Sequence, residues 1–500
     1  MKIESKCRIL EGIWKCVPEN GSAEDEENLL QNFLPLRSYN RLADEKTFLI
    51  TGGRGSGKTE LFKILTDCGR LNDIISERDR KRYTGWKEIE FLVGYRAKGP
   101  GAKWFPSANV CDDFLKNEKP QNLTAFWGGF VCSALLKRFR NEVNTLADQY
   151  LGEDIKNSLI HRSSEISLWW RSLDANKEKW ESFLDQADSV FEKKKIHVCL
   201  VYDELDRICG NYDQLFGFIR SLLDFWYRHN GRYTNLKAKI FLRSDLYHAK
   251  ALQFADASKI GAYRLKLSWD VRSLYRLLVK RMANTGIMEM DAYLQSVPDL
   301  LQMEVNDQLG YLPQDSEDAF QQLIHKMIGP YMGKNAKRGR SYIWVPNHIQ
   351  DAKGEIAPRS FLKCFSFASE EMLNCKNDIE MLENERILSP TRLQGAVAKV
   401  SVDRVQELTQ EEYHWLENLI HRLNHQTMLM EMDEFLDYLK PEHWSEEQRG
   451  LLPGKSGTEI LEALLDLGII MKTTDNRINF PEIYLHGFGL KRKGGIKRPK

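Results

Sequence analysis

A glycine-rich segment of eight residues constrains the fold of this chain more than any other feature. Residues 52–59 read GGRGSGKT and match G-x-x-x-x-G-K-[ST] at every fixed position. The apolar run Thr47–Thr51 before the segment predicts a buried strand, and the apolar spacing of Glu60–Leu65 after it predicts a helix. A strand, a glycine loop and a helix in this order are typical of a phosphate-binding loop. We therefore expect an α/β fold with a mainly parallel sheet flanked by helices.

The residue types in this segment suit a nucleoside triphosphate and its metal ion. Glycines let successive backbone N–H groups turn toward phosphate oxygens, and the following helix directs its positive end at the same anion. Lys58 would neutralise charge on the β- and γ-phosphates, and the Thr59 hydroxyl would ligate Mg²⁺. The predicted nucleotide-binding residues are Gly52, Gly53, Arg54, Gly55, Ser56, Gly57, Lys58 and Thr59.

A second apolar run, Ile196–Tyr202, predicts a strand that ends in an acidic segment beginning Asp203-Glu204. Carboxylates at the tip of a buried parallel strand lie at the edge of the sheet where a phosphate loop opens. We expect Asp203 to hold the Mg²⁺ and Glu204 to orient and deprotonate the attacking water. Two alternatives stay open: Asp203 could cap a helix, and Asp206 could be structural rather than a ligand.

A third run, Ala238–Leu242, predicts a strand followed by Arg243 and Ser244. In a nucleotide-binding sheet this tip is expected between the other two. Arg243 or Ser244 could then sense the γ-phosphate or the water. The alternative is that Arg243 only forms an ion pair with Asp245 or Glu204.

Composition excludes several classes of protein. The chain has 500 residues, of which 42% are hydrophobic and 29% charged, so it can bury cores and is not globally disordered. Its 72 Lys and Arg against 71 Asp and Glu exclude a polybasic nucleic-acid coat. No apolar stretch is long enough for a membrane span, and Met1–Lys6 lacks a signal-peptide pattern. Nine cysteines without a CxxC pair predict reduced thiols and a cytoplasmic location.

The remaining sequence predicts the domain organisation. Six tryptophans between the glycine loop and residue 195 require burial, so we expect a packed insertion rather than a mobile loop. The pattern from Thr458 to Phe480 predicts a helix, a strand, a turn and a strand, as in a winged helix. The expected parts are an N-terminal segment (1–34), a nucleotide-binding core (35–265, insertion 96–190), a helical lid (266–400), a helical and winged-helix-like domain (401–490) and a basic tail (491–500).

Periodicity also gives expectations for single elements. Ile89–Tyr95 is expected as a strand and Thr124–Val143 as a helical run. Asp213–Tyr227 and Ser268–Ala283 are expected as helices. Gly329–Glu355, rich in Gly, Lys and Arg, is expected as a loop.

The three strand tips, in their order, resemble the AAA+ and STAND branch of the P-loop NTPases. The matching segments are the GxxxxGKT loop, VYDELDRI as the hydrolysis strand and IFLRSDL as a sensor strand. YRLKLSWDVRSLYRLLVKRM then resembles a passage from a strand to a lid helix. Pro358–Phe361 resembles the start of a lid helix, with Arg359 as a second sensor. One departure is the 144-residue distance from Thr59 to Asp203, which exceeds that of the usual family core.

The resemblance implies ATP and Mg²⁺ as cofactors and an ATPase that acts as a molecular switch or motor. Bacterial ATPases of this kind work in anti-phage defence or signalling complexes, as homo-oligomers or with an effector protein. No membrane partner is expected. An alternative is an ATP-regulated DNA-binding loader or recombination protein, and a third possibility is a kinase. The basic tail 491–500 could contact nucleic acid or could be solvated without a partner.

Overall fold

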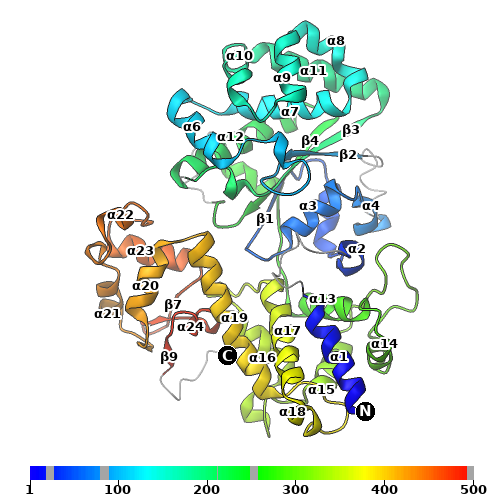
Figure 1. The fold of residues 1–500 in the computed structure, drawn as a ribbon, viewed down its shortest axis with the longest axis vertical. Helices are drawn as coiled ribbons and strands as arrows, with labels where there is room; N and C mark the ends of the chain where they lie inside the picture. Colours follow the sequence, from blue (N-terminus) through cyan, green and yellow to red (C-terminus); the bar gives the residue numbers. More distant parts are fainter. Residues whose placement is uncertain (18–27, 79–88, 211, 248–256, 493–500) are drawn as a thin grey trace. The chain divides into compact units, whose positions relative to one another are not determined.

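The computed structural model describes residues 1–17, 28–78, 89–210, 212–247 and 257–492. They form two compact units (Figure 1). The sheet unit is Pro35–Leu267, and the helical unit combines Met1–Leu34 with Ser268–Lys500. The acidic segment around residues 19–27 lies outside the described residues.

The sheet unit is built on a five-stranded parallel sheet with the order β2-β3-β4-β1-β5. β4 lies between β1 and β3, which confirms that the tip carrying Arg243 is the central one of the three. Apolar residues fill β1 and most of β3 and β4 because both faces of the sheet are covered. The strands are β1 Leu49–Gly52, β2 Ile89–Tyr95, β3 His197–Tyr202, β4 Leu236–Arg243 and β5 Arg264–Lys266.

Helices and 3₁₀ turns surround this sheet. α3 begins at Lys58, directly after the glycine loop, and contacts β1, β3 and β4. The elements of the unit are η2 Arg37–Ala43, α3 Lys58–Thr66, α4 Leu71–Ile74, η4 Ala102–Trp104, α6 Ala108–Glu118, α7 Thr124–Arg138, α8 Arg140–Tyr150, α9 Glu153–His161, η5 Ile166–Leu168, α10 Trp170–Ala175, α11 Lys177–Lys194, η6 Leu205–Arg207, α12 Tyr212–Asn230 and η7 Ala257–Tyr263.

The segment between β2 and β3 folds into a packed helical bundle, seen in Figure 1 as the group α7 to α11. Trp127, Trp169 and Trp180 are fully buried in it, and one continuous core joins them to strand residues such as Leu200. The segment between β2 and β3 is therefore packed around buried tryptophans, as their frequency in the sequence predicted. The single helical run expected over Thr124–Val143 is wrong, because the backbone leaves the helical conformation at Phe139 and separates α7 from α8.

The helical unit contains an element that the sequence reasoning did not identify. α1, Ile3–Lys15, buries Ile9, Leu10 and Ile13 and packs on α14 and α17. The loop expected over Gly329–Glu355 is also partly wrong, since it contains η8 and the helix α16. The helices before residue 412 are α1, α2 Leu29–Asn32, α13 Val271–Ala283, α14 Met288–Gln295, α15 Glu317–Met327, η8 Ala336–Arg338, α16 Ser341–Ile349, α17 Pro358–Asn374, α18 Lys376–Glu380 and α19 Pro390–Glu411.

The C-terminal part has the topology of a winged helix. The helices α20, α21, α22 and α23 are followed by a β7–β8 hairpin, in which Met471 pairs with Asn479. A bridge between Met430 and Ile478 adds an antiparallel partner to β8. The expected helix, strand, turn and strand are therefore present. The elements are α20 Trp415–Leu423, β6 Thr427–Met428, α21 Met432–Tyr438, η9 Pro441–His443, α22 Glu446–Arg449, α23 Gly457–Asp466, β7 Met471–Lys472, β8 Ile478–Asn479, α24 Glu482–Leu485 and β9 Lys491–Arg492.

Among the residues described, no helix has both the length and the apolar composition needed to cross a membrane.

Candidate nucleotide-binding site

The loop between β1 and α3 has a backbone that needs its glycines. Gly55 and Gly57 adopt φ values of 72° and 92°, in the left-handed region that side chains with a Cβ rarely occupy. A Cβ on Gly52 would lie 2.3 Å from Ser56 Oγ. The glycine positions of the motif are therefore set by this conformation, which turns the loop around the start of α3.

Lys58 is the first residue of α3, and its side chain folds back over the loop. Its Nζ donates hydrogen bonds to the carbonyl oxygens of Gly52 (3.0 Å) and Gly53 (2.9 Å). Burial lowers the pKa of Lys58 to about 8; nearby Asp203 opposes this shift, and Arg243 adds to it. The ammonium group therefore lies where the β1, β3 and β4 tips meet.

Asp203 and Thr59 form a pair that can hold a divalent cation. The Thr59 side chain hydrogen-bonds the Asp203 carboxylate, which is 4% exposed. Burial raises the pKa of Asp203 to about 7, although Lys58 and Thr59 act in the opposite direction. Asp203 Oδ2 is buried and has no hydrogen-bond partner within the described parts of the chain. A carboxylate oxygen and a hydroxyl are ligands that Mg²⁺ accepts, so these residues fit the ion.

Glu204 is held by the segment that follows β2. Its φ is +55°, and its Oε2 accepts the backbone N–H groups of Ala97 (3.0 Å) and Lys98 (2.9 Å). Arg207 Nη1 lies 3.5 Å from Glu204 Oε1. Glu204, rather than Asp203, precedes the turn at Leu205–Arg207, and neither carboxylate caps it. The helix-cap alternative for Asp203 is therefore wrong.

At the β4 tip, Arg243 is paired with two carboxylates. Its guanidinium lies 2.7 Å from Asp245 and 3.2 Å from Asp206. The ion pair with Asp245, named as the alternative to a sensor role, is present, and Asp206 is the second partner of Arg243. Ser244 Oγ is buried without a hydrogen-bond partner in the described chain. Ser244 is thus the side chain at this tip with a free polar atom.

Sequence reasoning missed the contribution of the segment after β2. Ala97 and Lys98 act through backbone N–H groups, for which side-chain identity gives no signal. Arg96 orders the same segment, because its Nε donates to Lys98 O (2.7 Å) and its Nη1 lies 3.3 Å from Asp67. The position of β2 beside β3 is what brings this segment to Glu204.

Arg359 belongs to the helical unit, where it is the second residue of α17. Its Nη1 lies 3.9 Å from Glu407 Oε1. Its assignment as a second sensor stays a prediction.

Comparisons with known proteins identify no family for this chain. No protein-family model matches the chain, and no curated protein matches it. Among solved structures, the ORC2 protein of Aeropyrum pernix, determined as ADPNP–ADP complexes, aligns over 92% of this chain and 94% of its own. The identity is 12% and the TM-score 0.38.

Proposed function

We propose that this protein is a Mg²⁺-dependent ATPase that works as a molecular switch. The observation that carries the proposal is the convergence of Lys58, Thr59 and Asp203 at the tips of β1 and β3, with Asp203 Oδ2 left without a partner. A triphosphate with its metal ion needs a positive charge beside the phosphates and oxygen ligands for the metal. The buried ammonium of Lys58 can supply the charge, and the Thr59 hydroxyl and the free Asp203 oxygen can supply the ligands.

Binding would begin with an exchange of partners at Lys58. Its Nζ would leave the carbonyls of Gly52 and Gly53 and donate to phosphate oxygens instead. The N–H groups of the loop and the first turn of α3 would surround the same phosphates. Asp203 and Thr59 would hold Mg²⁺, which supplies charge neutralisation between the phosphates. All of these groups are already near one another, so binding needs little reorganisation of the fold.

Hydrolysis would use Glu204 as the base for water. In the structure its Oε2 accepts the amide N–H groups of Ala97 and Lys98, so this oxygen is occupied. Release from Ala97 and Lys98 would free Glu204 to take a proton from the attacking water. Ser244 could then orient the water or the γ-phosphate with its unpartnered Oγ. Arg243 and Arg359 remain the proposed charge sensors.

Water is favoured over a second substrate as the phosphate acceptor. Adjacent acidic residues at one strand tip allow one to hold the metal ion and the other to activate water. Product analysis tests this directly. Free phosphate released in proportion to ADP supports hydrolysis, whereas a phosphorylated second molecule would show a kinase.

The biological setting is a proposal that rests on the resemblance of the strand tips to AAA+ and STAND proteins. We propose a cytoplasmic role in a defence or signalling complex, as a homo-oligomer or with an effector protein. Mass measurement with and without a non-hydrolysable ATP analogue tests nucleotide-driven assembly. An unchanged mass at all protein concentrations would argue against a homo-oligomeric switch.

A second candidate function is ATP-regulated DNA binding, which the winged-helix topology favours. The charges of the module restrict how it could bind. Residues 412–480 carry thirteen Asp or Glu and six Lys or Arg. The exposed side chains of α23 include Glu459, Glu462 and Asp466, which would repel phosphates. Contact through the basic segment 491–500, of which 493–500 lie outside the described residues, is a route that these charges leave open.

Salt dependence tests this second candidate. Binding to duplex DNA that weakens steeply with added salt, and is lost when 491–500 are deleted, would support it. Equal binding by the truncated and complete chains would place the DNA contact elsewhere.

A further inference from the structure

A cavity of about 220 Å³ lies in the sheet unit beside α7. α7 lines it with four residues whose spacing of three and four places them on one face of the helix: Phe130, Ser133, Ala134 and Lys137. The other lining residues are Val93 of β2, Gly101, Trp104 and Phe105 of the segment after β2, and Ser163. An apolar cavity of about 150 Å³ can hold benzene, so this one has room for a single ring with a short substituent.

A cation stands at the wall of this cavity. Among the described residues that line it, only Lys137 is charged. Its Nζ donates a hydrogen bond to Ser163 Oγ (2.8 Å) and lies 4.0 Å from the centre of the Trp104 ring. Ser163 and Trp104 line the cavity as well, so the ammonium group lies among its lining side chains. Lys137 has no ion pair within the described part of the chain.

The surroundings of Lys137 do not neutralise its charge. Burial lowers the pKa of Lys137 to about 8, and no carboxylate opposes that effect. Ser163 is 1% exposed, and its Oγ donates to the carbonyl oxygen of Trp104 (2.8 Å) while it accepts from Lys137. The exposed Lys103, whose Nζ lies 5.4 Å from the centre of the Trp104 ring, adds a second positive charge nearby. An anion is therefore the electrostatic complement of this cavity.

The rest of the lining is apolar and largely aromatic. The rings of Phe105 and Phe130 have their centres 5.3 Å apart, and both line the cavity. Flat rings pack well on such surfaces. One ammonium group matches a single negative charge, whereas a phosphate with two charges would need more donors. We propose that this cavity binds a small aromatic carboxylate, with the carboxylate on Lys137 and the ring against Phe105 and Phe130.

The cavity adjoins the segment that holds Glu204. Ala97 and Lys98 donate to Glu204, and the same segment continues to Trp104 and Phe105. Backbone hydrogen bonds from Ala102 N to Gly99 O (3.2 Å) and from Trp104 N to Gly101 O (3.1 Å) order the chain between them. A ligand that contacts Trp104 could therefore influence hydrolysis, an effect that rests on the proposed function. Binding itself does not depend on that function.

Calorimetric titration of the full-length protein with benzoate tests the proposal. Benzamide, which has the same shape without the charge, is the comparison. A saturating non-hydrolysable ATP analogue with Mg²⁺ occupies the glycine loop, where an anion is also expected to bind. We expect one saturable site for benzoate and binding of benzamide that is weaker by at least about tenfold, because the charge-assisted hydrogen bond is missing.

Lys137→Met removes the charge and keeps the length of the side chain. It should weaken benzoate binding by at least about tenfold and change benzamide binding by less than about twofold. Lys103→Met is the matched control, because it makes the same change at the other lysine beside Trp104, which does not line the cavity. It should change benzoate affinity by less than about twofold, since salt screens an exposed charge. Ala134→Phe fills the cavity from α7 and should weaken the binding of both ligands.

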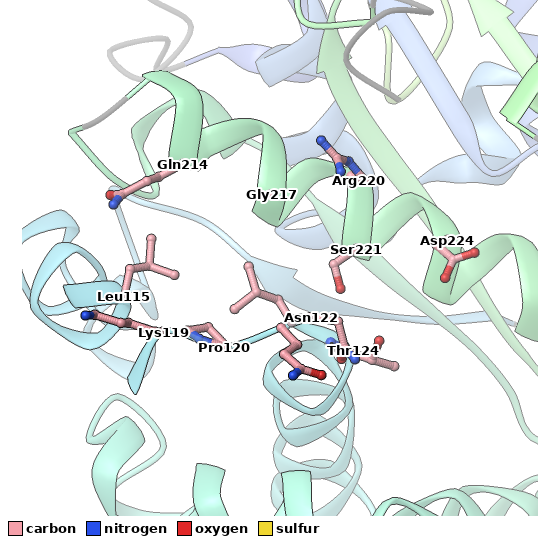
Figure 2. Close-up of a pocket in the computed structure, with 12 residues that line it drawn as sticks. Leu115, Lys119, Pro120, Asn122, Thr124, Gln214, Gly217, Arg220, Ser221 and Asp224 are labelled. Carbon is pink, nitrogen blue, oxygen red and sulfur yellow. Dashed lines mark hydrogen bonds between the residues drawn. The ribbon is translucent and has the colours of Figure 1, made fainter. Parts of the chain in front are cut away.

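Another cavity of the sheet unit, of about 440 Å³, lies between α12 and the segment that joins α6 to α7 (Figure 2). Gly217→Leu fills that cavity, because a Cβ on Gly217 meets only Leu123 Cδ1, at 3.9 Å, and a larger side chain extends into the space. This variant should bind benzoate as the wild type does. Weaker benzoate binding in Gly217→Leu would place the ligand in the other cavity and overturn the proposal.

The absence of a saturable benzoate site, or equal benzoate affinity in wild type and Lys137→Met, would also overturn the proposal. If the ATP analogue itself does not bind, the proposed function fails. The comparison of Lys137→Met with Lys103→Met still decides whether the carboxylate lies on Lys137.

Discussion

Glu204 Oε2 lies 2.9 Å from the backbone nitrogen of Lys98 and accepts its N–H. Ala97 donates to the same oxygen, so the proposed catalytic base is tied to the segment that leaves β2. Arg96 fixes that segment by its bond to Lys98 O. Movement of the segment would therefore break the hydrogen bonds that hold Glu204. The bonds of Lys58 to Gly52 and Gly53 lie in a different loop.

Glu204→Gln is expected to preserve nucleotide binding and to slow hydrolysis by about 10²- to 10⁴-fold, because an amide cannot take the proton from water. Phosphate release and binding of a fluorescent ATP analogue measure the two effects separately. Glu178→Gln, at an exposed position of α11, is the matched control and should leave both unchanged. Normal turnover in Glu204→Gln would remove Glu204 from the mechanism.

Affinity for Mg²⁺ with nucleotide should depend on pH through Asp203. Burial raises the pKa of Asp203 from 3.8 to about 7, so the ion must displace a proton below neutral pH. Affinity should fall by up to about tenfold per unit as the pH drops below 7. Titration of Mg²⁺ at several pH values measures this affinity. The Asp203→Asn variant should bind Mg²⁺ more weakly than the wild type, and its affinity should not depend on pH. A wild-type affinity that does not change between pH 5 and 8, roughly the range of the titration, would contradict the assignment.

The same pKa predicts the sign of a stability change in the protein without Mg²⁺. Between about pH 4 and 7 the folded chain keeps a proton on Asp203 that the unfolded chain has released. The contribution of Asp203 to the free energy of unfolding is therefore fully present below pH about 4 and is lost as the pH rises through 7. Comparison of wild type with Asp203→Asn in urea unfolding at each pH isolates it. The stability difference should move in favour of the Asn variant as the pH rises.

Arg243→Ala should lower hydrolysis and also destabilise the β4 tip. Removal of the guanidinium leaves Asp206 and Asp245 without their shared partner, at a cost of about 1–3 kcal/mol. Arg243→Lys keeps the charge but cannot bond both carboxylates in the same geometry, so it should recover stability only in part. Urea unfolding and phosphate release measure the two effects. Unchanged values for both in Arg243→Ala would show that the ion pairs have no role.

Gly129→Ala should destabilise the sheet unit by about 1–3 kcal/mol, because a Cβ would lie 2.3 Å from the buried Trp169 ring. Gly231→Ala is the control, since no atom lies within 4 Å of its Cβ position. Denaturant unfolding followed by tryptophan fluorescence compares them. Equal stability would show that the helices between β2 and β3 are loosely packed.

The acidic face of α23 should keep the winged helix away from duplex DNA. Glu462→Lys combined with Asp466→Lys should increase DNA affinity and its salt dependence, because two repulsive charges become attractive. Fluorescence anisotropy with a labelled duplex measures this. If the double variant binds no better than the wild type, α23 does not face the DNA in any complex that forms.

Much of the sheet and its tips could be predicted because local signals coincide there. The glycine motif, the apolar runs and the acidic tip each indicate the same arrangement, and β4 lies between β1 and β3 as expected. α16 could not be predicted, because Pro346 and the surrounding glycines favour a loop, whereas burial of Tyr342 and Val345 stabilises the helix. The break at Phe139 has the same origin, since tertiary packing rather than periodicity ends α7. The amide contacts of Glu204 have no sequence signature at all.

Equilibrium binding of Mg²⁺ and a fluorescent ATP analogue to wild type and Lys58→Ala tests whether the glycine loop is the nucleotide site. We expect saturable binding by the wild type and a loss of at least about 100-fold in Lys58→Ala, because the buried ammonium is the principal charge that would face the phosphates. Lys63→Ala, on the same helix, is the control and should bind normally. Equal binding by wild type and Lys58→Ala, with both folded by circular dichroism, would show that the glycine loop does not bind the nucleotide.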